Sequence, residues 1–235
     1  MEQLPLIVLL LYALYEGLFH AIEADHVLAV TNIVSQRNNI LHALKDGVFW
    51  GLGHTSTIFL IGIIMILFKV NIPDSSFSYF EAAVGLMLIL VSSYRLFIFL
   101  KNEQTLINFH RHQHEHAGVN EHLHTHIHPT GKHLHKTAYG IGFVHGLAGS
   151  GALVVLVMTQ IEVIAHSLLY LVIFGIGSIV GMTLVAGVFS IPFSKKLINS
   201  KTVKAVLVIL SSVLCFAYGC YVIYQNLHFP FPTFN

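Results

Sequence analysis

The chain has 235 residues, of which 55% are hydrophobic and only 10% are charged, and its formal net charge is +1. Soluble domains carry about 25% charged residues, so this chain lacks the side chains needed to cover a surface that faces water. Its mean hydropathy of +0.73 instead indicates a membrane protein. We expect the lipid bilayer as its surroundings and no nucleic acid among its partners.

Six apolar segments are long enough to cross a bilayer, since a spanning helix needs about 20 residues. In chain order they are residues 4–34, 44–70, 77–100, 138–160, 164–193 and 203–224. The first segment is too long for a straight crossing, so we expect it to tilt or to break near its charged residues. The predicted fold is an all-α integral membrane protein with six transmembrane helices.

The basic residues predict the orientation. Eleven of the twelve lysines and arginines fall at or between spans one and two, three and four, or five and six, and only Lys69 falls on the opposite side. Basic residues stay on the cytoplasmic side of a membrane. We therefore expect a multi-pass protein of the inner (cytoplasmic) membrane, with both termini outside and these three loops in the cytoplasm.

The two halves of the chain resemble each other. Residues 17–20 (Gly-Leu-Phe-His) recur as 142–145 (Gly-Phe-Val-His) at an offset of 125, and residues 49–54 match residues 173–178 at an offset of 124. Each half holds three predicted spans, an odd number, so the second half would be inverted relative to the first. Inverted repeats of this kind build transporters with a site near the midplane. The alternative is chance matching between glycine-rich helices.

The first span carries five ionisable residues within eleven positions: Glu16, His20, Glu23, Asp25 and His26. A central aspartate costs about 2.5–3.5 kcal/mol to insert, so such residues are functional candidates. On a regular helix Asp25 points away from the face that His20 and Glu23 share. His20, Asp25 and His26 can therefore bind one ion only if the helix unwinds, unless Asp25 serves another helix or supports the ligands from behind.

Imidazole combined with carboxylate suits nickel, cobalt or zinc, whereas calcium and magnesium prefer oxygen ligands alone. The charged segment therefore predicts a site for a divalent transition metal. The alternative is a buried salt-bridge cluster that holds helices together.

Two motifs resemble a known family. His20-Ala-Ile-Glu-Ala-Asp25-His26, followed by Asn32, resembles the His-x4-Asp-His signature of the nickel/cobalt transporter family, and Leu52-Gly-His54-Thr-Ser resembles its Leu-Gly-His segment. Glu23 and Thr31 depart from the long members of that family, and the length is more similar to the six-span branch, some of whose members accompany urease or hydrogenase genes.

The resemblance implies a metal site made of His20, Asp25, His26 and His54. Further candidates, as ligands or as partners of the ligands, are Glu16, Glu23, Asn32 and His145. His145 is the repeat partner of His20, which an inverted fold would bring to the same centre, although a histidine that only packs between helices is an equal alternative.

Between the two halves, 1–101 and 138–235, lies a histidine-rich stretch at 102–137. Its ten histidines are His110, His112, His114, His116, His122, His124, His126, His128, His133 and His135. Alternating His-x-His offers no hydrophobic face, so we expect a disordered cytoplasmic loop that binds nickel, zinc or copper. It would store metal, pass it to nickel chaperones of urease or hydrogenase maturation, or capture metal for export; the alternative is a dispensable linker.

We predict a nickel or cobalt permease that works by alternating access, with import favoured over export by the same site. It would need no resident cofactor beyond the transported ion, and the chain has no Gly-x4-Gly-Lys-Ser/Thr loop for ATP. A more distant alternative is an intramembrane hydrolase with Ser150 as nucleophile and His145, His54 or His166 as base. The repeat explains Ser150 without catalysis, because it occupies the position of Asp25.

Overall fold

The structure is a computed structural model that describes residues 5–37, 39–68, 74–105, 134–147, 161, 163–194 and 200–227. All regular structure within these residues is helical. The helices are α1 (Leu6–His20), α2 (Ala24–Val34), α3 (Ile40–Phe68), α4 (Asp74–Thr105), α5 (Leu134–His145), α7 (Ile164–Ser190), the short 3-10 helix η1 (Ile191–Phe193) and α8 (Lys201–Leu227).

Four helical segments, formed by α3, α4, α7 with η1, and α8, are long and apolar enough to cross a membrane. The bent pair α1 and α2 makes a fifth candidate span. A helix that is apolar on all sides suits lipid, and the segment Ile164–Phe193 has a mean hydropathy of 2.3. The protein is therefore an all-helical integral membrane protein. Helix α5 has only 12 residues, and 148–160, the rest of the fourth predicted span, lies outside the described residues.

The first span is broken, as its length and charges predict. Helix α1 ends at His20, α2 begins at Ala24, and the two are bent by 54°. Glu23 precedes α2 in an extended conformation, with φ −60° and ψ 149°. Asp25 then lies in the first turn of α2, where a carboxylate interacts favourably with the positive end of the helix dipole. The break accommodates the charged segment within the membrane.

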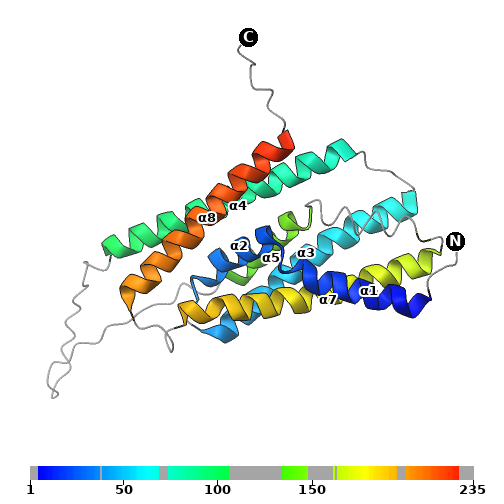
Figure 1. Ribbon diagram of the computed structural model, residues 1–235, viewed down its shortest axis with the longest axis horizontal. Helices are drawn as coiled ribbons and strands as arrows, with labels where there is room; N and C mark the ends of the chain where they lie inside the picture. Colours follow the sequence, from blue (N-terminus) through cyan, green and yellow to red (C-terminus); the bar gives the residue numbers. More distant parts are fainter. Residues whose placement is uncertain are drawn as a thin grey trace, which may run out of the picture.

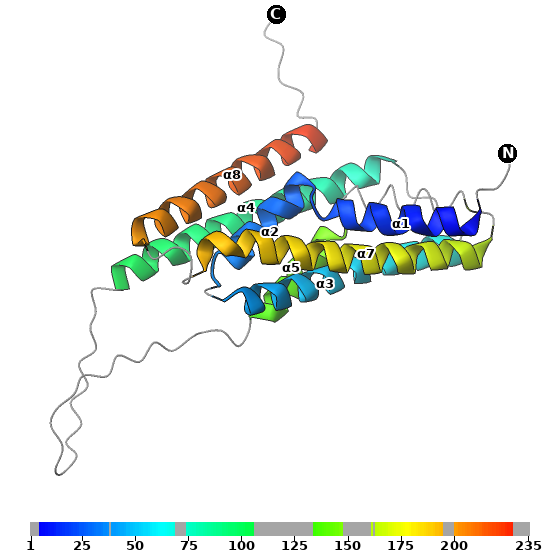
Figure 2. The ribbon, with the colours of Figure 1, turned by 60° about the horizontal axis from the view of Figure 1, so that its bottom comes forward.

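The helices form two groups that α2 connects. Helix α1 lies along α7, and α3 packs against both α5 and α7 (Figure 1). Helices α4 and α8 pack closely on each other as a pair, which both views show (Figure 2), and α4 also contacts α5. Helix α2 contacts α7 on one side and both α4 and α8 on the other. The break in the first span therefore lies where the two groups meet.

Glycines allow the closest helix crossings. A Cβ atom on Gly53 of α3 would collide with the backbone of α5 at Tyr139 and Phe143, and one on Gly142 of α5 would collide with the backbone of α3 at Trp50. Small residues at helix crossings let backbones approach in a membrane, where lipid provides little hydrophobic driving force. The pairing of α3 with α5 therefore depends on these glycines.

The structure narrows the predicted loop at 102–137. Helix α4 continues to Thr105 and α5 begins at Leu134, so His135 belongs to a helix rather than to a disordered loop. Its Nδ1 lies 2.6 Å from Oδ1 of Asp46 on α3, and its ring stacks on Phe49. This anchoring to α3 explains why the helix starts earlier than the hydropathy suggests. The other nine loop histidines, at 110, 112, 114, 116, 122, 124, 126, 128 and 133, lie outside the described residues.

Candidate metal site

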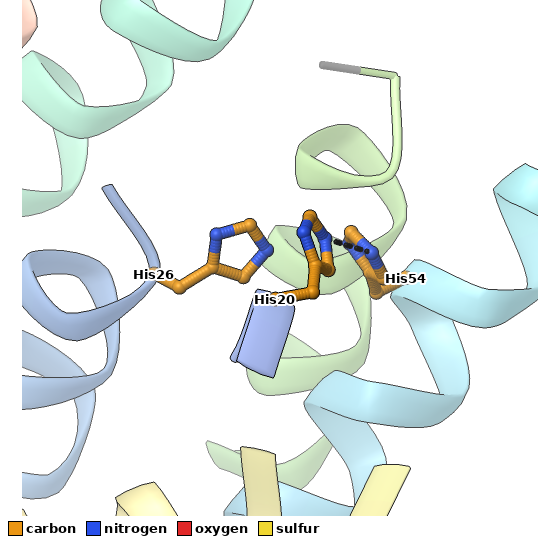
Figure 3. A group of neighbouring side chains, drawn as sticks. All are labelled: His20, His26 and His54. Atoms are coloured by element: carbon orange, nitrogen blue, oxygen red, sulfur yellow. Dashed lines mark hydrogen bonds between the residues drawn. The ribbon is translucent and has the colours of Figure 1, made fainter. Parts of the chain in front are cut away.

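The break between α1 and α2 brings His20, His26 and His54 together (Figure 3). His20 is the last residue of α1, His26 lies in the first turns of α2, and His54 comes from α3. Ligand atoms of the three imidazoles all lie within 4.8 Å of one another. His26 and His54 are fully buried and His20 is only 5% exposed. The sequence motifs therefore meet in one place, and local unwinding is what makes this geometry possible.

The spacing of these imidazoles suits a transition metal. Nε2 of His20 and Nε2 of His54 are 2.9 Å apart, which without an ion is one N–H···N hydrogen bond (Figure 3). Two imidazole nitrogens that each lie about 2.0–2.1 Å from a metal are separated by about 3 Å when they occupy neighbouring positions. Among the described residues, His54 Nδ1 and His26 Nε2 are buried without a hydrogen-bond partner. An ion bound here could use the unpartnered nitrogen of His26 and would replace the hydrogen bond between His20 and His54.

Asp25 joins a second, overlapping group. Its Oδ1 lies 3.0 Å from His26 Nδ1 and its Oδ2 lies 2.8 Å from His145 Nε2. His145, the last residue of α5, is fully buried and stacks on His26 with ring centroids 4.1 Å apart. Ligand atoms of Asp25, His26 and His145 again lie within 4.8 Å of one another. His26 therefore belongs to both groups, and α5 contributes to the site as well as the first half of the chain.

The remaining candidates lie around this centre. Glu23 accepts a hydrogen bond from His20 Nδ1 through its Oε1, 3.0 Å away, and its side chain is 46% exposed. Glu16 pairs with Tyr12, one turn earlier on α1. Asn32 uses both ends of its amide on α2 and α8: its nitrogen donates to two backbone carbonyls, and its oxygen accepts from the hydroxyl of Ser212. Of the three, only Glu23 contacts a histidine of the cluster.

Sequence reasoning missed Trp50 and passed over Ser178. The Trp50 ring is fully buried, with its centroid 5.5 Å from His26 and 5.8 Å from His145. Within the described part of the chain, Trp50 Nε1 and Ser178 Oγ are buried without partners. Trp50 is the chain's one tryptophan and lies one helical turn before His54, a spacing that places both on the same face of α3. That spacing is the sequence signal for Trp50, and Ser178 corresponds to His54 at the repeat offset of 124.

The fold and this cluster define a class of protein, the polytopic membrane transporter. Such transporters place their ion sites at broken helices and build them from ionisable side chains. Here the site consists of buried imidazoles and a carboxylate at the broken first span. A family profile described as "High-affinity nickel-transport protein" (NicO) matches residues 6–214. The chain belongs to the NicO family of nickel transporters.

A curated relative supports the same family. The "Urease accessory protein UreH" of Bacillus sp. (strain TB-90) is 34% identical over 194 residues, which cover 83% of this chain and 81% of that protein. No solved structure matches the chain. The protein is thus a transmembrane transporter of nickel or cobalt rather than an enzyme. Ser150, the nucleophile of the hydrolase alternative, lies outside the described residues.

Proposed function

We propose that the chain takes up nickel across the cytoplasmic membrane and that the ion, stripped of most of its water, is held by His20, Asp25, His26 and His54. The observation that carries this proposal is the convergence of buried imidazoles, of which His26, His54 and His145 each have one ring nitrogen without a partner within the described residues. A buried polar group without a partner costs about 1–3 kcal/mol. A bound cation removes that cost, which a purely structural cluster would not do.

Asp25 supplies the negative charge. A divalent ion in a buried site needs a compensating charge, and this carboxylate is the acidic group that bonds His26 and His145. Metal-binding histidines commonly donate their second ring N–H to a carboxylate, which fixes the ring and makes the ligand more basic. In the group His20, His26 and His54, Asp25 can support His26 through this hydrogen bond. In the group Asp25, His26 and His145, it can bind the ion directly. The two overlapping groups provide successive positions for one ion, with His26 as the shared ligand.

The two halves of the chain are proposed to be inverted repeats. Support comes from close approaches that occur in pairs at the offsets of 125 and 124. A Cβ on Gly53 would meet the backbone at Tyr139 and Phe143, whereas one on Gly177 would meet the backbone at Leu14 and Leu18. These contacts are the repeat equivalents of each other, because Gly53 corresponds to Gly177, Leu14 to Tyr139 and Leu18 to Phe143. On this proposal, α1 crosses α7 as α5 crosses α3, and six spans result.

The proposed direction is inward, with the termini outside and the histidine-rich loop in the cytoplasm. A divalent cation gains about 4.6 kcal/mol per 100 mV when the inside is negative. The urease accessory name of the relative favours delivery of metal to the cytoplasm over its removal. The histidine-rich loop would then receive the ion and pass it to cytoplasmic nickel chaperones.

The site is tested by measuring uptake of labelled nickel into proteoliposomes. His26→Ala and His54→Ala each remove an imidazole from the cluster, and we expect uptake to fall at least tenfold. His42→Ala is the matched control, because His42 lies on the same helix as His54 but is exposed. Uptake at the wild-type rate in His26→Ala would remove the proposed site.

The direction is tested by expression in a metal-starved host. An importer sensitises the cells to added nickel, whereas an exporter protects them. If the cells are protected from nickel and the protection is lost in His26→Ala, the histidine site is correct and the protein exports nickel instead of importing it.

A further inference from the structure

A cavity of about 350 Å³ lies beside the histidine cluster, between the start of α2 and the pair α4–α8. Its lining combines carboxylates, tyrosines and side-chain amides with a few small apolar residues. The polar lining includes Glu23, Asp25, Glu81, Tyr218, Tyr221 and Gln225. Among the described residues the lining holds no lysine or arginine, so these carboxylates make the cavity suitable for a cation.

The inner wall of the cavity is formed by the residues that hold the histidines. Glu23 accepts a hydrogen bond from His20, and Asp25 bonds both His26 and His145. Just behind this wall lies the fully buried His26, whose Nε2 has no partner among the described residues. A cation in the cavity therefore lies next to the Asp25 carboxylate, which bonds the Nδ1 side of the His26 ring, and the unpartnered Nε2 lies on the other side of that ring.

Glu81 also lines the cavity, but the histidine site gives it no role. It comes from α4, on the opposite side of the cavity from Glu23 and Asp25, and no hydrogen bond or ion pair to it is found within the described residues. An ionisable residue within a membrane span is costly and is retained where it serves an ion or substrate. Glu81 is therefore a candidate ligand in its own right.

The size of the cavity suits an ion that still carries its water. Water occupies about 30 Å³ per molecule in the liquid, so the shell of about six waters around a small divalent ion needs about 180 Å³. Hydrated cations are held through oxygen atoms, and the cavity provides carboxylate, phenol and amide oxygens. The histidine cluster instead provides nitrogen ligands for an ion that has lost its water. The two neighbouring sites thus suit successive stages of dehydration.

We propose that this cavity is a capture site open to the non-cytoplasmic side, where Glu81 and Glu23 hold a hydrated nickel ion before it moves past Asp25 to the histidines. The inference rests on the proposed function and adds Glu81 and the α4–α8 pair to the transport route. The cavity is lined by the first part of α4 and the last part of α8. The distribution of basic residues places these helix ends away from the cytoplasm.

The kinetic test uses Glu81→Gln, which keeps the shape of the side chain and removes its charge. We expect the KM for nickel uptake into proteoliposomes to rise about tenfold while the maximal rate stays within about twofold, because the inner site is intact. Asp74→Asn is the control: it removes an acidic charge from the first residue of the same helix. An unchanged KM in Glu81→Gln, or an equal rise in Asp74→Asn, would overturn the capture site.

The accessibility test uses Gln225→Cys in a chain that also carries Cys220→Ser. We expect a cationic, membrane-impermeant thiol reagent added outside intact cells to modify this cysteine several-fold faster than an anionic one, and we expect nickel to slow the reaction. Leu227→Cys, at the end of the same helix but outside the cavity lining, is the control and should show no protection by nickel. Absence of labelling from outside, or of protection by nickel, would contradict the proposal.

The two proposals fail separately. With the inner site removed by His26→Ala, transport should be lost while nickel still protects Gln225→Cys. Loss of transport without protection would remove the capture site and retain the histidine site. Wild-type transport in His26→Ala would remove the histidine site, whatever the result at the cavity.

Discussion

Asp25 fixes the orientation of two imidazoles from different helices. One carboxylate oxygen contacts His26 on its own helix and the other contacts His145 on α5. A carboxylate that receives two N–H groups leaves the opposite nitrogen of each ring available as a lone pair. The unpartnered His26 Nε2 and His145 Nδ1 within the described residues fit this arrangement. In the proposed metal site, Asp25 therefore orients these two rings from a position between them.

We expect Asp25→Asn to weaken nickel binding by about 10–100-fold, the usual cost of losing a carboxylate that supports a metal-bound histidine. The amide can accept a hydrogen bond at its oxygen alone, so one of the two imidazoles loses its partner. Calorimetric titration of the purified protein with nickel measures the change. Glu23→Gln should have a smaller effect, since that carboxylate is 46% exposed and contacts one histidine. Equal effects of the two variants would contradict the central role of Asp25.

A second carboxylate, Asp46, has a structural role. It forms a buried ion pair with Arg37 and also accepts a hydrogen bond from His135. Removing one partner of a buried pair costs about 3–5 kcal/mol, because the other charge stays buried without compensation. We therefore expect Asp46→Ala to destabilise the protein by about that amount in denaturant unfolding in detergent micelles. The double variant Arg37→Met, Asp46→Leu should recover most of the loss; no recovery would mean that His135 is the essential partner.

The crossing of α3 and α5 positions the cluster, because α3 carries His54 and α5 carries His145. Backbone contact at Gly53 and Gly142 brings the two helices close enough for both histidines to reach His26. A wider crossing would separate them. On the proposed function, we therefore expect these glycines to affect metal binding although they are not ligands.

A matched pair of substitutions on α5 tests this crossing. Gly142→Ala places a methyl group against the backbone of Trp50, whereas a Cβ on Gly140 has no atom within 4 Å. Overpacking costs about 1–3 kcal/mol, so Gly142→Ala should lower thermal stability in detergent and weaken nickel binding. Gly140→Ala should be neutral or slightly stabilising, since alanine restricts the unfolded chain. If both variants behave alike, close approach of the helices is not what holds them in place.

Apolar length is a local property, so the sequence predicts four helices that are long and apolar enough to span a membrane and a fifth candidate span in the bent pair α1–α2. The predicted span at 138–160 is described only up to residue 147. The break in the first span also follows from its length and its charges. His20 and His54, by contrast, are 34 residues apart, and their meeting depends on the packing of α1 and α3 on α7. The family motifs name both residues without giving their geometry. Glu81 could not be assigned from sequence, because it shares a cavity with Glu23 and Asp25 only through the packing of α2 against α4.

Helix α2 connects the two groups of helices, and the transport proposal predicts that they move relative to each other. Its last part is tied to the α4–α8 pair: Arg95 of α4 donates to Ser35 at the end of α2, and Asn32 bonds Ser212 of α8. Its first residues border the cavity instead. Helix α2 is thus held at its last residues and borders the cavity at its first residues. Its last residues are therefore the expected pivot. Alternating access would follow if the α4–α8 pair turned about the end of α2 and closed the cavity.

A reversible cross-link across the cavity tests this motion. Ala24→Cys with Val222→Cys joins α2 to α8 across the cavity, and Val84→Cys with Val222→Cys joins α4 to α8 within the pair, both with Cys215→Ser and Cys220→Ser. A bifunctional thiol reagent that spans the cavity should abolish nickel uptake in the first variant, because the pair can no longer move relative to α2. Reduction should restore it. The second link should leave uptake largely intact, since α4 and α8 move together. Uptake that survives the first link would show that the ion crosses without this rotation, and the pivot would then have to lie within α1, α3, α5 and α7.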